Sequence, residues 1–106
     1  KNKFNIMANR RELKKDINWL TEEVVSDCLI YWEFNKNKNK EHVVDIINSV
    51  ITKRNELISR INKPTSKMTR HEVKSAYNQV VKEMFEVTNE SLEKLSELAK
   101  KNAKAN

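Results

Sequence analysis

Residues 13–31 read LKKDINWLTEEVVSDCLIY, and the spacing of their apolar side chains decides the fold class. The apolar positions recur at steps of three or four residues and are Leu13, Ile17, Leu20, Val24, Cys28 and Tyr31. This period places all of them on one face of an α-helix. Asn9 with Glu12 three residues later is close to a capping box, so we expect the helix to span residues 9–34.

Two later runs have the same period. The first comprises Val43, Ile47, Val50, Ile51, Leu57, Ile58 and Ile61. The second comprises Val73, Tyr77, Val80, Met84, Val87, Leu92, Leu95 and Leu98, with Thr88 and Ser91 interrupting its last third. The first run is rich in β-branched residues, but its spacing of three and four excludes a strand. These runs predict helices over residues 41–62 and 70–100.

The expected helix boundaries rest on local signals. The Asn and Lys tract of residues 35–40 has poor helix propensity, and proline in Lys63-Pro64 disfavours helix in the residue before it. Thr69 and Glu72 form a capping box at the start of the third helix. Three long helices with connections of about six residues pack most simply as an up-down-up bundle. We therefore expect an all-α, elongated, antiparallel three-helix bundle that forms one domain over residues 1–106.

The composition excludes several classes of protein. The chain has no glycine and one proline among 106 residues, which removes the phosphate-binding loops, dinucleotide turns and nucleophile elbows that depend on glycine. It has no apolar run of transmembrane length and no signal-peptide pattern at its first residues. The single cysteine, Cys28, cannot form an internal disulfide, which fits a reducing compartment. We expect a cytoplasmic protein that does not enter the membrane.

Candidate catalytic and metal-ligating residues are sparse. His42 and His71 begin successive helices, so the antiparallel topology places them at opposite ends of the bundle. Zinc needs three or four ligands around one ion, and the chain has no such spacing of His and Cys. A row of carboxylates repeats at three and four residues and is expected to be a solvated ladder: Glu83, Glu86, Glu90, Glu93 and Glu97. We predict no catalytic residue, no metal and no cofactor, and hence no enzyme.

Arg54 lies on the apolar face of the second helix, where a guanidinium needs a partner. One interpretation is that its stem packs against the core while its head group reaches a carboxylate on a neighbouring helix. The other is an internal anion site or a salt bridge between subunits. Both remain open at the level of sequence.

Residues 28–34, CLIYWEF, are apolar on nearly every side of the first helix, so a single bundle seam cannot cover them. Trp and Tyr are enriched at interfaces. We therefore predict a protein interface, formed in a homodimer or with another protein, that comprises Trp19, Leu29, Ile30, Trp32 and Phe34. The alternative is that Trp32 and Phe34 fold over the open end of the bundle.

The second candidate surface is basic. The chain has a net charge of +6, and the expected topology gathers eight cations at one end: Arg10, Arg11, Lys14, Lys15, Lys63, Lys67, Arg70 and Lys74. Cations in the first turn of a helix oppose the helix dipole, and binding of an anion would compensate this cost. Phosphate contact fits this pole, whereas base reading does not, because no aromatic residue is interleaved for stacking. Lys36, Lys38, Lys40, Lys100, Lys101 and Lys104 form a second basic pole, which favours general solvation.

Residues 9–18, NRRELKKDIN, resemble the opening of a small all-helical bacterial protein family that carries no assigned activity. The resemblance covers about the first thirty residues and implies a helical, intracellular bacterial protein, without transferring any site. The sequence as a whole predicts a non-catalytic interaction or regulatory module that self-associates through its first helix. The alternative function is binding of the nucleic-acid phosphate backbone through the basic pole.

Overall fold

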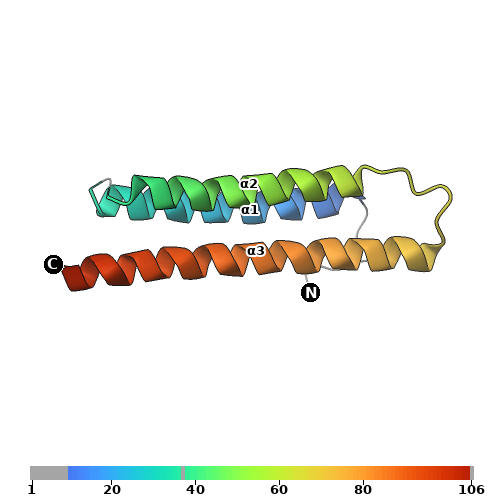
Figure 1. Ribbon diagram of the computed structural model, residues 1–106. Helices are drawn as coiled ribbons and strands as arrows, with labels where there is room; N and C mark the ends of the chain where they lie inside the picture. Colours follow the sequence, from blue (N-terminus) through green and yellow to red (C-terminus); the bar gives the residue numbers. More distant parts are fainter. Residues whose placement is uncertain (1–9, 37, 106) are drawn as a thin grey trace.

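The computed structural model describes residues 10–36 and 38–105, of which 87% are helical, with no strand among them. The three helices are α1 (Arg10–Phe34), α2 (Lys40–Ile61) and α3 (Arg70–Ala105). Figure 1 shows that α1 and α3 run in one direction and α2 in the other, and each helix contacts both others. The expected elongated antiparallel bundle is therefore confirmed, with principal extents of 57 × 27 × 16 Å.

The turn between α1 and α2 uses asparagine where many proteins use glycine. Lys36 and Asn39 adopt left-handed backbone conformations, with φ of 52° and 62°. Asparagine tolerates this region better than most residues because its short side chain hydrogen-bonds locally. The Asn35 side-chain amide donates to the Tyr31 carbonyl at 2.8 Å, beside the bond that the same carbonyl accepts from the Asn35 backbone N–H at 3.0 Å. The Asn39 amide donates to the Tyr31 hydroxyl at 2.9 Å.

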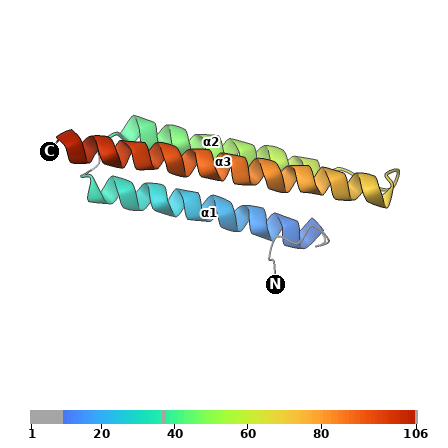
Figure 2. The same ribbon diagram turned by 90° about the horizontal axis from the view of Figure 1, so that it is seen from below.

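The start of α3 confirms the predicted capping box. The Thr69 backbone N–H donates to the Glu72 carboxylate at 2.8 Å, and the Glu72 N–H donates to the Thr69 hydroxyl at 3.1 Å. The expected cap of α1 at Asn9 lies outside the described residues. The prediction placed the end of the third helix at residue 100, but α3 continues to Ala105 because its Lys and Ala residues favour helix. In both views α3 is the longest rod and extends past α2 at both ends (Figures 1 and 2).

The core confirms the predicted stripe of α1 in full, since Leu13, Ile17, Leu20, Val24, Cys28 and Tyr31 are all buried. The stripe of α2 differs from the prediction. Ile46 is buried where Ile47 was expected, Ile47 and Ile58 are partly buried, and Ile51 is 39% exposed. In α3 the core is formed by Tyr77, Val80, Met84, Thr88, Ser91, Leu95 and Leu98. Leu92 was expected in this core but is 37% exposed. Val73 and Val87, also expected there, are partly buried and pack against the core residues.

Within the described residues, no helix carries an apolar stretch long enough to cross a membrane.

Candidate functional site

The outward face of α1 carries most of the predicted interface. Trp19 is 44% exposed, Leu29 49%, Ile30 51% and Phe34 82%. Trp32 differs from these four, because it is partly buried and packs against the core. Its indole N–H is buried and has no hydrogen-bond partner among the described residues. The alternative in which both aromatic rings fold over the open end of the bundle is therefore wrong for Phe34.

The predicted basic pole is assembled at the end of the bundle where α1 and α3 begin. The Arg10 guanidinium donates to the Lys63 carbonyl and to the Tyr77 hydroxyl, each at 3.4 Å. These bonds join the start of α1 to the connection between α2 and α3 and to α3 itself. Arg70 lies seven residues before Tyr77, so the first turns of α3 project about 10 Å beyond Arg10 along the helix axis.

The cations of this pole are turned to solvent. Six of them are exposed, namely Arg11, Lys15, Lys63, Lys67, Arg70 and Lys74, and Arg10 and Lys14 are half-buried. None of the eight takes part in an ion pair with another described residue. The opposite end carries exposed cations as well, at Lys36, Lys38, Lys40, Lys100 and Lys101. The side chain of Lys104 lies outside the described part of the molecule.

The four ion pairs between described residues lie on α2 or join it to α3. The Glu83 carboxylate accepts from Lys53 Nζ at 2.7 Å and from both terminal nitrogens of Arg60 at 2.9 Å. Gln79 donates to it at 3.0 Å, while Lys53 and Arg60 also contact Glu56. Hydrogen bonds from Arg60, then Lys53 and Gln79, hold the pKa of the Glu83 carboxyl far below its ordinary value.

The sequence prediction for Glu83 was wrong. It was assigned to a solvated ladder, but its side chain is only 17% exposed and is bound by three neighbours. A signal was present in the seven-residue spacing of Lys53 and Arg60, which puts two cations on one face of α2. That signal identifies a partner only once the face of α3 opposite them is known.

Arg54 has a partner on a neighbouring helix, but the partner is an amide. Its Nε donates to Asn18 Oδ1 on α1 at 2.8 Å, and its Nη1 donates to Asn55 Oδ1 at 2.7 Å. The expected carboxylate is replaced by two asparagines, and the guanidinium is half-buried. Asn18 and Asn55 satisfy two of its donor nitrogens within the chain, so the geometry supplies no reason for an anion site here.

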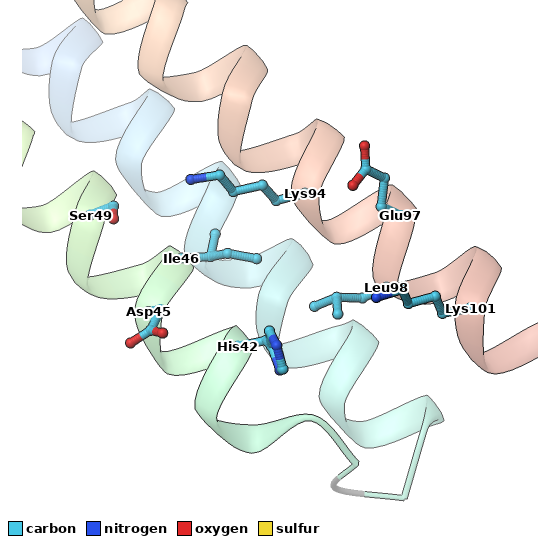
Figure 3. A pocket seen from close by; sticks show the side chains of 8 residues that line it. All are labelled: His42, Asp45, Ile46, Ser49, Lys94, Glu97, Leu98 and Lys101. Atoms are coloured by element: carbon cyan, nitrogen blue, oxygen red, sulfur yellow. The ribbon is translucent and has the colours of Figure 1, made fainter.

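A shallow cavity of about 320 Å³ lies between the first turns of α2 and the last third of α3. Its lining, drawn in Figure 3, comprises His42, Asp45, Ile46, Ser49, Lys94, Glu97, Leu98 and Lys101. The Glu97 carboxylate points away from α2, whereas Leu98 points toward it (Figure 3). Cationic and acidic side chains surround an apolar floor formed by Ile46 and Leu98.

The nucleophile and metal candidates are not brought together. Cys28 is fully buried, and burial followed by the nearby Asp27 carboxylate raises the pKa of its thiol to about 11. A buried thiol of this kind is a poor nucleophile because it is protonated near neutral pH. His42 and His71 begin helices at opposite ends of the bundle. Across residues 10–36 and 38–105, no three His, Cys, Asp or Glu side chains lie close enough to hold a metal ion.

No protein-family model, curated protein or solved structure matches this chain. The resemblance of residues 9–18 to an all-helical bacterial family therefore stays a prediction.

Proposed function

We propose that this chain is a non-catalytic helical interaction module that self-associates through α1. The observation that carries the proposal is the exposure of Leu29, Ile30 and Phe34 within two turns at the C-terminal end of α1. Each square ångström of apolar surface removed from water contributes about 25 cal/mol, so a partner that covers these side chains is favoured. A second copy is the simplest such partner, because it presents the same surface.

The distribution of exposed apolar residues supports α1 over the other helices. Four large apolar side chains on α1 are exposed, and the most exposed is Phe34 at 82%. Elsewhere in the described residues the exposed examples are Val44 and Ile51 on α2, Met68 in the connection and Leu92 on α3, at 37–41%. Such scattered residues are normal on any protein surface, whereas a cluster indicates an interaction site.

Light scattering coupled to size exclusion tests the proposal. We expect a mass near twice 12.5 kDa that changes little with salt. Leu29→Gln should shift the protein toward the monomer, because it places a polar group in the contact. Val44→Gln is the matched control, since Val44 is 41% exposed but lies on α2. A wild-type mass of 12.5 kDa at every concentration would refute self-association.

Nucleic-acid binding is the second candidate, and the eight cations of the basic pole favour it. They converge on one end, and none is neutralised by an ion pair with a described residue. Binding to phosphates releases counterions, so affinity for a labelled duplex should fall steeply as salt rises. Arg11→Glu with Arg70→Glu should weaken binding, whereas Lys36→Glu with Lys40→Glu at the opposite end should not. Equal losses from both pairs would reject a directed site.

The proposal also includes the cellular compartment of the protein. We infer a reducing, cytoplasmic compartment because Cys28 has no second cysteine in the chain and is fully buried. Fractionation of cells that express the chain tests this inference, and recovery outside the cytoplasmic fraction would contradict it.

A further inference from the structure

The charges of α1 change sign along the helix, from a basic N-terminal part to an acidic C-terminal part. Residues 10–15 carry four cations and one carboxylate, whereas residues 16–34 carry five carboxylates and no cation. The basic part is short and lies at the N-terminal end, and the acidic part covers the rest of the helix. When two copies lie in opposite directions, the basic end of each helix lies near the acidic C-terminal end of the other, so Lys15 of one copy can meet Glu33 of the other.

The outward face of α1 combines these charges with two of the four exposed apolar residues of the helix, Trp19 and Leu29. A helix turns about 100° per residue, so Lys15, Trp19, Leu29 and Glu33 fall within an arc of about 80°, which also holds Arg11, Glu22 and Ser26. The centre of that arc lies opposite the buried stripe. Trp19 and Leu29 are 44% and 49% exposed. Lys15 and Glu33 are exposed and pair with no described residue.

The spacing of these four residues is symmetric. Lys15 precedes Trp19 by four residues, and Glu33 follows Leu29 by four. We propose that a second copy docks on this face in the antiparallel direction, with Trp19 against Leu29 of that copy and Lys15 against its Glu33. The contact has a twofold axis near the middle of α1, so each pairing occurs twice. This inference rests on the self-association proposed above and specifies its geometry.

The parallel arrangement lacks this complementarity. It would place Lys15 against Lys15 and Glu33 against Glu33, whereas the antiparallel register pairs Lys15 with Glu33 twice. Residues 16–32, which carry four carboxylates, overlap in both directions, so Lys15 and Glu33 are the charges that distinguish them. Like charges facing one another across an interface disfavour the wrong partner or orientation. The charges therefore select the antiparallel direction, while the apolar side chains supply the attraction.

Charge reversal distinguishes the two directions. In the antiparallel dimer, Lys15→Glu or Glu33→Lys alone turns two attractive pairs into two repulsive ones, and each should raise the dimer dissociation constant about tenfold. The double variant with both changes restores opposite charges at both contacts and should return to within about twofold of the wild type. Analytical ultracentrifugation measures these constants, and circular dichroism checks that helix content is unchanged. Single variants without effect, or a double variant weaker than either single one, would overturn the antiparallel contact.

Cross-linking supplies a second readout of direction. Lys15→Cys mixed with Glu33→Cys should form a mixed disulfide on mild oxidation, and neither variant alone should cross-link. Cys28 stays in place, because it is fully buried and its thiol, with a pKa of about 11, is protonated near neutral pH. Self-linking of each variant alone would show a parallel dimer and refute this geometry, with self-association intact. A monomer at every concentration would refute the self-association proposal and this geometry together.

Discussion

Arg60 on α2 and Glu83 on α3 form a two-point ion pair, in which both terminal guanidinium nitrogens donate to separate carboxylate oxygens at 2.9 Å. The planar guanidinium of Arg60 matches the planar carboxylate of Glu83, so the two parallel hydrogen bonds fix the relative orientation of the groups as well as their distance. Lys53, which lies two turns earlier on α2, donates to the same carboxylate at 2.7 Å. The two cations therefore hold one position of α3 against one face of α2, and they set the relative register of the two helices.

Removing the Glu83 charge should destabilise the bundle. Glu83→Gln keeps the shape of the side chain but leaves Arg60 and Lys53 without their shared carboxylate, at a cost of about 1–2 kcal/mol. Urea denaturation followed by circular dichroism measures the change in the free energy of unfolding. Glu86→Gln is the control, because Glu86 is exposed on the same helix and forms no ion pair with a described residue. Equal effects of the two substitutions would show that the ion pair does not stabilise the fold.

The same carboxylate predicts the acid sensitivity of the protein. Hydrogen bonds from Arg60, Lys53 and Gln79 lower the pKa of Glu83 in the folded state, so the unfolded state takes up a proton first as the pH falls. The stabilisation is complete above the ordinary carboxyl pKa of 4.5 and is lost progressively below it. Unfolding free energies measured from pH 7 to pH 3 should decline more steeply for the wild type than for Glu83→Gln. Parallel curves would contradict this linkage.

Sequence spacing predicted α1 more accurately than α2, because the expected stripe of α2 took both members of the adjacent pairs Val50-Ile51 and Leu57-Ile58, of which only Val50 and Leu57 are fully buried. On α1 the expected stripe took one member of each adjacent apolar pair, such as Val24 rather than Val25, and all six of its residues are buried. On α2 the adjacent residues Ile46 and Ile47 are both candidates for the core, and their side chains point about 100° apart. Packing against α1 and α3 buries Ile46. The ion pair of Glu83 was missed for a related reason, since a carboxylate row on one helix does not reveal the cations of another. The exposure of Leu29, Ile30 and Phe34 was anticipated because the segment has more apolar residues than one seam can cover.

The capping box at the start of α3 should act locally. The Thr69 hydroxyl accepts from the Glu72 N–H, but the first buried residue of α3 is Tyr77, two turns later. Thr69→Ala removes that acceptor and should cost about 1 kcal/mol within the first turn. Faster amide hydrogen exchange over residues 70–75, with unchanged exchange near Met84, is the expected outcome. Thr65→Ala is the control, because Thr65 lies in the connection before the box. Unchanged exchange in the first turn of the Thr69 variant would contradict the capping role.

Two buried threonines should respond oppositely to the same substitution. The Thr21 hydroxyl donates to the Ile17 carbonyl at 2.9 Å, whereas the Thr88 hydroxyl is buried without a hydrogen-bond partner among the described residues. Valine replaces the hydroxyl by a methyl group of similar size. Because an unsatisfied buried hydroxyl costs about 1–3 kcal/mol, Thr88→Val should raise the free energy of unfolding by about 1 kcal/mol.

Thr21→Val should give no such gain, since it removes a satisfied group whose net contribution is about 0.5–1.5 kcal/mol. Thermal and urea unfolding of both variants beside the wild type measure the difference. The two threonines are almost equally exposed, 8% for Thr21 and 7% for Thr88, so a difference in exposed surface cannot explain different effects of the two substitutions. The comparison isolates the hydrogen bond, and a Thr88 variant less stable than the wild type would show that its hydroxyl has found a partner in solution, such as water entering the seam between α3 and its neighbours.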